Sequence, residues 1–543
     1  NWQVPAEMEY PSTNNDNTIS LVQQSVRKEH TASIGVKEAP QTQYEQTLAA
    51  IWQQILMIDS VSRHDDFFAL GGHSLLIMQM ITVLQQQNIS LSASQIFKTP
   101  ELAELALVLE QQSHENEESN NISSTHKSSI PSTTNKITPQ MLPLINLAQD
   151  DIDNIVNRIP GGISNIQDIY PLAPLQEGIL FHHRMSPDND PYVMPAYLKI
   201  NGTDNFKLFI DAIKQIISRH DTLRTAVLWR NLPEPVQVVH RHAELSITKI
   251  ELDCGHDLLT QMQQLDEQQK LGVDIEKAPL FNITFSHQPE NDHYVIRMLD
   301  HHIISDHVSM SILQQELALI VTGQQLPEPV QYRQYIAQLV SQQTEQQASA
   351  KAYFSQQLAD FAEPSLPFGV RQLTSDTFAI LEKEVWLSKE LSHQVRNTAK
   401  QLKTNPATLF HCAYALVIAA CSNKEDIVFG TVMSGRMQGL AGSESIMGMF
   451  INTLPLRIQL NSLTAAQLVE RMQQALLALI PYEQTPLAEI QQANETFAQT
   501  NNDLPLFSAL LNYRHTDKKD KQTYHALSQL KFIDPIERTN YPF

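Results

Sequence analysis

The N-terminal part of the chain contains three short blocks in which apolar residues recur at helical spacing. The first block would place five large side chains on one face of a helix: Tyr44, Leu48, Ile51, Trp52 and Ile55. Two further blocks, from about residue 74 to 87 and from about residue 100 to 111, carry the same kind of stripe. Three amphipathic helices so close together predict a small all-α bundle over residues 40–112.

Polar segments flank this bundle on both sides. Residues 11–43 are rich in Ser, Thr, Asn and Gln, and we assign residues 1–39 to a linker or to the tail of an upstream region. Residues 113–136 have the same character and predict a flexible interdomain linker. Because the chain begins at Asn1 and not at a methionine, we expect it to be cut from a longer protein.

Beyond residue 137 helical and strand-like segments alternate. We expect helices at 205–218, 313–321 and 464–479, and strands at 196–200, 294–298 and 426–429. This alternation predicts a mixed α/β region of about 400 residues, large enough for two lobes. We assign residues 137–315 to an N-lobe, and residues 316–543 to a C-lobe that we expect to be incomplete at its C-terminal end.

The overall composition is that of a globular protein, with 42% hydrophobic and 18% charged residues. The formal net charge of −21 argues against a nucleic-acid or anionic-membrane partner, because phosphate-rich surfaces attract clustered Lys and Arg. No apolar run reaches the length of about 18 residues that a membrane span needs, so we expect no membrane segment. Cys254, Cys412 and Cys421 show no paired spacing, which favours a reducing, cytoplasmic location.

The first candidate site is a serine that follows two glycines at the start of the second predicted helix. Gly71 and Gly72 allow a tight turn, and Ser74 then lies in the first helical turn. A phosphate ester on Ser74 would be stabilised by the free backbone N–H groups and the helix dipole. The pattern is equally typical of a serine that only caps the helix.

The surrounding sequence, DDFFALGGHSL at 65–75, resembles the signature of peptidyl carrier proteins from non-ribosomal peptide synthetases. The resemblance extends over residues 40–112. It implies that Ser74 carries a covalent 4′-phosphopantetheine arm, attached by a separate phosphopantetheinyl transferase. His73 before the serine is the variant usual in carriers that feed a condensation-type domain.

The second candidate site is the cluster MLDHHIISDHVS at 298–309. Period-two alternation predicts a strand that ends near Asp300, so His301 and His302 should point to opposite faces. Ser309 is the expected N-cap of the following helix. Histidine titrates near neutral pH, and an aspartate such as Asp306 can orient it, so the cluster suits acid/base chemistry.

Two other chemistries are possible at this cluster, besides a buried pair of histidines satisfied by hydrogen bonds. His302 and Asp306 have a spacing that suits a metal, but they precede the predicted helix and no second Cys/His cluster supplies further ligands. We therefore predict no metal. A nucleophilic triad is disfavoured because the chain has no GxSxG turn.

The cluster also resembles the HHxxxDG motif of condensation domains, which join two carrier-bound acyl groups. His301, His302 and Asp306 are in register, and His307 replaces the glycine. Further motifs occur in the order of the family: RHDTLRT (219–225), DIVFGTVMSGR (426–436), MGMFINTLP (447–455), PYEQTPLAEIQ (481–491) and LFSALLNYRH (506–515). The resemblance covers residues 140–543 and implies two chloramphenicol-acetyltransferase-like lobes in a V, with the histidines at a tunnel where donor and acceptor arms meet.

The resemblance also implies roles for individual residues. His302 would be catalytic, and would remove a proton from the attacking amine or position that amine. His301 would support the backbone. Asp306 would be structural and paired with an arginine, for which Arg224 is our candidate, and Asn452 would help to shape the tunnel.

A second histidine pair indicates the subtype. His182 and His183 lie in IYPLAPLQEGILFHHRMSPDND (169–190) and are followed by Asp190. Together with His307, this pattern resembles dual epimerization/condensation domains, although Asn189 stands where that pattern has a glycine. The pair could instead cap a strand–helix junction and touch no substrate.

The resemblance therefore implies an enzyme of non-ribosomal peptide synthesis, active in secondary-metabolite or antibiotic biosynthesis. It would epimerize the last residue of a carrier-bound L-peptidyl thioester and condense the D-form with a carrier-bound L-aminoacyl amine. The alternatives are a plain condensation domain and an inactive module that only docks carriers. A pure epimerization domain is disfavoured, because such domains usually follow a carrier with Asp before the serine. The expected partners are an upstream adenylation domain and downstream adenylation and carrier domains.

Overall fold

A computed structural model describes most of the chain: residues 38–72, 74–87, 89, 91–113, 130–185, 190–253, 255–269, 271–361, 363–370, 383–438, 440, 442–494, 504–514 and 530–533. The predicted linkers at 1–39 and 113–136 fall mostly outside these ranges. Within them, no single helix is long and apolar enough to cross a membrane, and one bent pair of helices meets the length and composition only when both are taken together.

The N-terminal domain is a bundle of four helices, α2 (Gln43–Leu56), α3 (Ser74–Gln86), α4 (Ala93–Lys98) and α5 (Leu102–Ser113). The three predicted helices are confirmed, with Trp52 fully buried in their common core. Helix α4 was not predicted because six residues are too few to show a periodic stripe. At the turn before α3, a Cβ on Gly72 would lie 2.3 Å from the ring of Phe67, so this position requires glycine.

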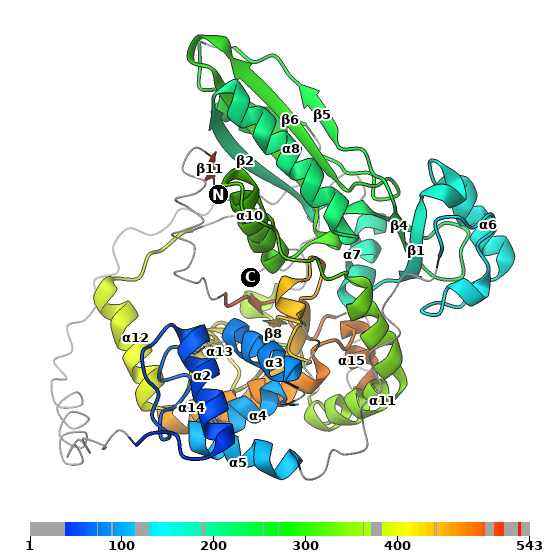
Figure 1. The fold of residues 1–543 in the computed structure, drawn as a ribbon. Helices are drawn as coiled ribbons and strands as arrows, with labels where there is room; N and C mark the ends of the chain where they lie inside the picture. The colour runs from blue at the N-terminus through cyan, green and yellow to red at the C-terminus, as the bar shows by residue number, and fades with distance from the viewer. Residues whose placement is uncertain are drawn as a thin grey trace.

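The rest of the chain forms two α/β lobes, one above the other in Figure 1. In the upper lobe a five-stranded sheet has the order β11-β2-β7-β6-β5, and a smaller sheet has the order β1-β4-β3. Helices α8 and α10 pack against the larger sheet. The elements of this lobe are α6 (Gln149–Arg158), β1 (Ile166–Pro171), α7 (Pro174–Met185), β2 (Val193–Asn201), α8 (Thr203–Arg219), β3 (Thr225–Leu228), β4 (Val236–His240), β5 (Ser246–Lys249), α9 (Leu258–Gln268), β6 (Phe281–Gln288), β7 (His293–His301) and α10 (His307–Val321).

The lower lobe is built on a sheet of order β10-β8-β9, with an apolar core to which α11, α13, α14 and α15 contribute. Its elements are α11 (Arg333–Gln357), α12 (Lys389–Gln401), α13 (Pro406–Ser422), β8 (Asp426–Met433), β9 (Asn452–Gln459), α14 (Ala465–Leu479), α15 (Leu487–Ala493) and β10 (Leu510–Leu511). The expected helices and strands of both lobes are present. Most extend beyond at least one predicted end, whereas α14 begins one residue after its predicted start and ends where predicted.

Two features of the predicted lobe boundaries are wrong. The division between residues 315 and 316 falls inside α10, which continues to Val321 as one helix. The C-terminal segment does not stay in the lower lobe, because β11 (Leu530–Ile533) pairs antiparallel with β2 in the upper sheet. Pairing between strands so far apart in the sequence leaves no local signal, so sequence periodicity could not reveal it.

The lobes meet in an aromatic cluster. Tyr170, Tyr332, Tyr335 and Phe450 are buried together, and the Tyr332 hydroxyl donates a hydrogen bond to the carbonyl oxygen of Met449 at 2.6 Å. This contact fixes α11, which begins just after Tyr332, against the segment that leads into β9.

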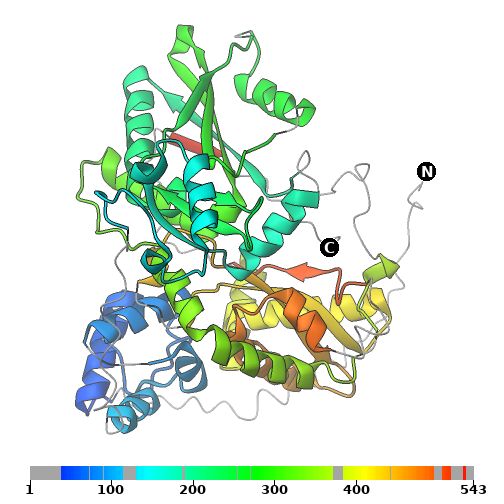
Figure 2. The ribbon, with the colours of Figure 1, turned by 90° about the vertical axis from the view of Figure 1, so that its right-hand side faces the viewer.

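The helical bundle lies against the lower lobe in both Figure 1 and Figure 2. Met437 and Ile480 of the lower lobe are buried with the apolar core of the bundle. Thr82 of α3 donates a hydrogen bond to Glu444 at 3.2 Å and accepts one from the backbone N–H of Gly442, also at 3.2 Å. These residues form the interface between the bundle and the lower lobe.

The junction between the lobes predicts the effect of one substitution. A Cβ at Gly448, whose φ is +153°, would lie 2.1 Å from the Tyr332 ring. We expect Gly448→Ala to reduce the stability of the folded protein by about 1–3 kcal/mol, because a packed ring must move. Gly178→Ala is the control, since nothing lies within 4 Å of its new methyl group. Differential scanning calorimetry should show a lower unfolding midpoint for Gly448→Ala only, and equal midpoints for the two variants would contradict this packing.

Candidate active site

The histidine cluster lies where β7 ends and α10 begins. His301 is the last residue of β7, and a short 3-10 turn, His302–Ile304, follows. The N-cap of α10 is Asp306, whose carboxylate accepts the backbone N–H of Ser309 at 2.9 Å. The prediction that Ser309 is the N-cap is wrong, because an aspartate three residues earlier already satisfies the free N–H groups.

His302 is half-buried and is held from two sides. Its ring Nδ1 lies 3.0 Å from the carbonyl oxygen of Ser305, and its backbone N–H donates to the carbonyl oxygen of Tyr192 at 2.8 Å. Because a carbonyl oxygen can only accept, Nδ1 carries the proton and Nε2 of the neutral ring has a lone pair. His302 therefore has the tautomer of a base that acts through Nε2.

His301 is fully buried, with its ring directed into the protein. Its Nδ1 accepts the backbone N–H of Ile303 at 3.1 Å, so its Nε2 carries the proton and donates to Asp190 at 2.9 Å. Burial lowers the pKa of His301, and the nearby carboxylate opposes this shift. Both ring nitrogens of His301 are thus used to hold the protein together.

Asp190 is the centre of a buried network. One carboxylate oxygen, Oδ2, accepts hydrogen bonds from His301 at 2.9 Å and from Nδ1 of His183 at 2.6 Å. The other oxygen accepts the backbone N–H of Tyr192 at 2.9 Å. Burial alone would raise the pKa of Asp190, but the hydrogen bonds from the two histidines outweigh it and hold the pKa well below its usual range. The network therefore connects α7, the start of β2 and the end of β7.

The structure separates the two members of the upstream pair. His183 is bound to Asp190, whereas the ring of His182 packs at 6.1 Å from that of Tyr192 and at 5.7 Å from that of Phe181. Burial lowers the pKa of His182, with the charge of Asp190 opposing the shift. Asn189, the residue that departs from the family pattern, lies outside the described residues.

The arginine that binds Asp306 is Arg436, and the prediction of Arg224 is wrong. Nη2 of Arg436 lies 3.0 and 2.8 Å from the two carboxylate oxygens, and both residues are almost completely buried. Arg436 follows β8 in the lower lobe, so the pair joins the two lobes. Arg224 donates instead to Gln167 at 2.9 Å and to the carbonyl oxygen of His240, because its η3 turn (Thr222–Arg224) faces β1 and β4.

Two other predicted site residues also link parts of the fold. Nδ1 of His307, the first residue of α10, accepts a hydrogen bond from Arg514 at 3.2 Å. The side-chain amide of Asn452 donates to the carbonyl oxygens of Glu483 and Thr485 at 3.0 and 2.8 Å. Asn452 thus fixes the turn that carries the PYEQTP motif.

Sequence reasoning missed three groups at this site. Arg436 is the last residue of the DIVFGTVMSGR motif (426–436), and the sequence marks it only as an arginine that follows an apolar strand. Glu483 is a buried carboxylic acid within PYEQTP whose pKa burial raises to about 8, and it accepts the backbone N–H of Met437 at 2.7 Å. The carbonyl oxygen of Tyr192 acts through the backbone, so its side chain gave no signal.

The network around Asp190 has a geometry that could also hold a metal ion. Its ligand atoms, from His183, Asp190 and His301, lie within 4.8 Å of one another. Hydrogen bonds account for each of these contacts, because His301 donates through Nε2 and the ionised carboxylate accepts. The absence of a metal stays a prediction.

Ser74 is the first residue of α3, which has 13 residues. The first backbone N–H groups of such a helix have no partner within it, and they favour a bound phosphate. Gly71, with φ of +105°, and Gly72 bring the chain into this turn. The position of Ser74 therefore fits a phosphodiester attachment.

Comparison with known protein families gives two matches. The family described as "Condensation domain" matches residues 166–543, and the family described as "Phosphopantetheine attachment site" matches residues 46–109. The second match means that the chain carries 4′-phosphopantetheine covalently on a serine of the helical bundle.

Among curated proteins, malpibaldin synthetase of Mortierella alpina is 41% identical over 510 residues, 93% of this chain. One component of the linear gramicidin synthase of Brevibacillus parabrevis is 30% identical over 397 residues, 70% of this chain. The chain spans only 9% and 8% of the lengths of these two relatives.

Two solved structures share the fold. The condensation domain from monacolin K polyketide synthase gives a TM-score of 0.53 at 16% identity, covering 69% of this chain and 88% of that one. The starter condensation domain of rhizomide synthetase gives a TM-score of 0.51 at 20% identity, covering 63% of this chain and 78% of that one. The predicted fold class, a small helical carrier followed by two chloramphenicol-acetyltransferase-like lobes, is confirmed.

The network around Asp190 predicts a pH-dependent effect of Asp190→Asn. Because the folded-state pKa lies below the unfolded value, ionised Asp190 stabilises the fold above about pH 4, and this contribution is lost as the pH falls further. We expect Asp190→Asn to lower the free energy of unfolding by about 1–3 kcal/mol at pH 7 and at pH 5. The loss should be smaller at pH 3.5.

Urea denaturation at these three pH values measures the effect. Asp211→Asn, at an exposed position on α8, is the control and should change little at any pH. A loss for Asp190→Asn that does not depend on pH would contradict the stabilising role of the ionised carboxylate.

Proposed function

The chain belongs to the condensation-domain family, the peptide-bond-forming domains of non-ribosomal peptide synthetases, and we propose that it is a dual epimerization/condensation enzyme that follows its own carrier. It would invert the last residue of an L-peptidyl or L-aminoacyl donor on Ser74. It would then join the D-form to an L-aminoacyl amine on a downstream carrier. The observation that carries the proposal is the fixed tautomer of His302, which leaves Nε2 as a base on a half-buried ring.

In the condensation step, Nε2 of His302 accepts a proton as the amine nitrogen attacks the donor thioester carbonyl. The new C–N bond replaces the C–S bond, and the departing thiolate takes up the proton. Nδ1 of His302 stays protonated while Nε2 takes up and releases the proton, because the carbonyl oxygen of Ser305 can only accept a hydrogen bond. Asp306 and Arg436 hold the turn that carries His302.

The donor reaches this site from the helical bundle at the N-terminal end. When bound on Ser74, 4′-phosphopantetheine supplies the thiol that holds the donor as a thioester. The interface between the bundle and the lower lobe supports delivery of the donor by the carrier of the same chain. Attachment at Ser74 requires a phosphopantetheinyl transferase, and we propose adenylation domains on both sides as further partners in a cytoplasmic assembly line.

In the epimerization step, Nε2 of His302 removes the proton from Cα of the donor residue, which the thioester carbonyl acidifies. A water molecule protonates Cα from the opposite face, which gives the D-configuration, and Nε2 of His302 loses the proton it took to solvent, which restores the base. Asp190 binds His183 and accepts the backbone N–H of Tyr192, whose carbonyl oxygen accepts the N–H of His302. This connection supports the subtype, because His183 and Asp190 belong to the sequence pattern of dual domains. We propose that they act by positioning.

A stereochemical experiment tests both steps. An L-dipeptidyl donor is loaded on Ser74, an L-aminoacyl acceptor carrier is added, and the configuration of the product is read by chiral chromatography. We expect a D-residue at the former donor position. His302→Ala should reduce product formation by about 10²–10⁴-fold, the usual contribution of a general base. His393→Ala, at an exposed position on α12, should leave it unchanged.

The other outcomes select the alternatives. Product that retains the L-configuration would leave a plain condensation domain. Carrier binding without product in the unaltered protein would leave a docking module. Equal rates for His302→Ala and the unaltered protein would remove His302 from the chemistry.

A further inference from the structure

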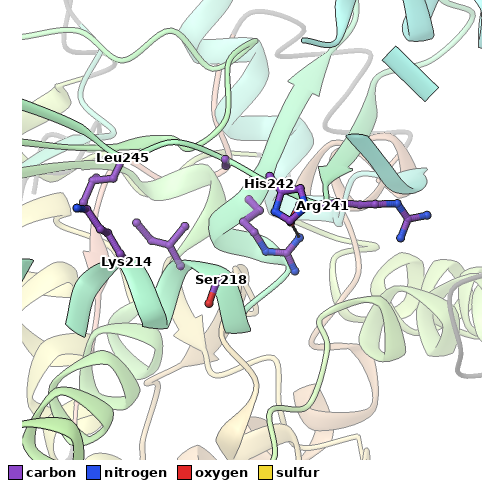
Figure 3. Close-up of a pocket in the computed structure, with 8 residues that line it drawn as sticks. Lys214, Ser218, Arg241, His242 and Leu245 are labelled. Atoms are coloured by element: carbon purple, nitrogen blue, oxygen red, sulfur yellow. Dashed lines mark hydrogen bonds between the residues drawn. The ribbon is translucent and has the colours of Figure 1, made fainter. Parts of the chain in front are cut away.

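A cavity of about 100 Å³ lies in the upper lobe, between α8 and the chain segment that follows β4. Figure 3 shows Lys214 and Ser218 on the helix, with Arg241, His242 and Leu245 on the segment across from it. Arg224 also lines the cavity. None of these residues belongs to the histidine cluster, and the proposed reaction does not use them.

Arg224, which lines the cavity, has an unused hydrogen-bond donor. Its Nη1 is held by Gln167 at 2.9 Å and by backbone carbonyl oxygens that include that of His240. Its Nε has no acceptor among the described residues, although the side chain is only 5% exposed. A guanidinium held at Nη1 presents Nε and Nη2 as a fork that matches two oxygens of a carboxylate or phosphate. Nε of Arg241 likewise has no acceptor within the described part of the chain.

The cavity is electropositive in a chain of net charge −21. No lining residue is acidic, and among the described residues no salt bridge involves Lys214, Arg224 or Arg241. Asp221 acts electrostatically on Arg224, but its carboxylate is occupied by the backbone N–H groups of Thr222, Tyr332 and Arg333. Asp221 therefore offsets part of the charge of Arg224, whereas Lys214 and Arg241 have no salt-bridge partner among the described residues.

The titration of His240 is consistent with this positive potential. Burial and the charge of Arg224 lower the pKa of His240 to about 4, so this neighbour stays neutral near pH 7. His240 thus adds no positive charge beside Arg224.

The helix dipole does not explain this cluster. Cations near the C-terminal end of a helix are favoured by its last carbonyl groups, and Lys214 and Ser218 lie near that end of α8. Arg224, however, donates to the carbonyl oxygen of His240, which is outside α8. The hydroxyl of Ser218 already donates to the carbonyl oxygen of Gln215 at 2.7 Å. The end of α8 therefore does not account for the position of Arg224.

We infer that this cavity binds a phosphate group, with Arg224 and Arg241 as donors at its base and Lys214 at its exposed rim. Its volume admits a few waters or one tetrahedral oxyanion, which leaves the rest of a larger ligand outside. The phosphate could come from inorganic phosphate or from the phosphate end of a larger metabolite. The inference does not depend on the chemistry proposed for His302.

Isothermal titration of the full chain with inorganic phosphate tests this inference. We expect saturable binding with one site per chain, weakened about tenfold by Lys214→Gln and further by the double substitution Lys214→Gln/Arg241→Gln. Lys207→Gln is the matched control, because it removes the same charge from an exposed position on the same helix. A parallel titration compares free 4′-phosphopantetheine with pantetheine, which lacks the phosphate.

The outcomes are distinct. Tighter binding of 4′-phosphopantetheine than of inorganic phosphate would identify a phosphate-bearing metabolite as the ligand, and equal binding would identify phosphate itself. The inference is overturned if phosphate shows no saturable binding, if Lys207→Gln weakens binding as much as Lys214→Gln, or if pantetheine binds as well as its phosphorylated form. The midpoint of thermal unfolding shows that each variant is folded.

Discussion

The ion pair between Asp306 and Arg436 is the interaction on which the site depends. It is buried, Nη2 of Arg436 contacts both carboxylate oxygens, and the pair crosses from the N-cap of α10 to the loop after β8. The same arginine donates to the carbonyl oxygens of Ser443 and Ile446 and lies 3.8 Å above the ring of Phe450. Removing one partner from such a pair costs about 3–5 kcal/mol, because the other charge stays buried. The two lobes are therefore fixed to each other at the point where the histidine turn begins its helix.

A second carboxylate holds the other side of this turn. Asp190 receives His183, His301 and the backbone of Tyr192, and the carbonyl oxygen of Tyr192 in turn receives the backbone N–H of His302. The paired register of Val193 with His301 brings these groups together. His302 is thus the one histidine of the turn whose Nε2 is not needed to hold the backbone, which agrees with its proposed role as the base.

Sequence patterns predicted the local features well. Period-two alternation predicted the strand that ends at His301, and helical stripes located α2, α3 and α5 of the carrier and α8, α10 and α14 of the two lobes. They could not predict which arginine meets Asp306, because that choice depends on how two lobes pack. Arg224 was nearer in sequence and stood in a family-like motif, but its turn faces β1 and β4. The pairing of β11 with β2 in the upper sheet could not be predicted either, because it also depends on contacts between distant parts of the chain.

The tautomer of His302 tests the central claim most directly. Two-bond ¹H–¹⁵N correlation spectra of protein labelled at histidine nitrogens, with His302→Ala for assignment, distinguish the two neutral forms. The structure predicts a proton on Nδ1, donated to Ser305, and a nonprotonated Nε2. A neutral His302 ring with its proton on Nε2 would contradict its role as the base.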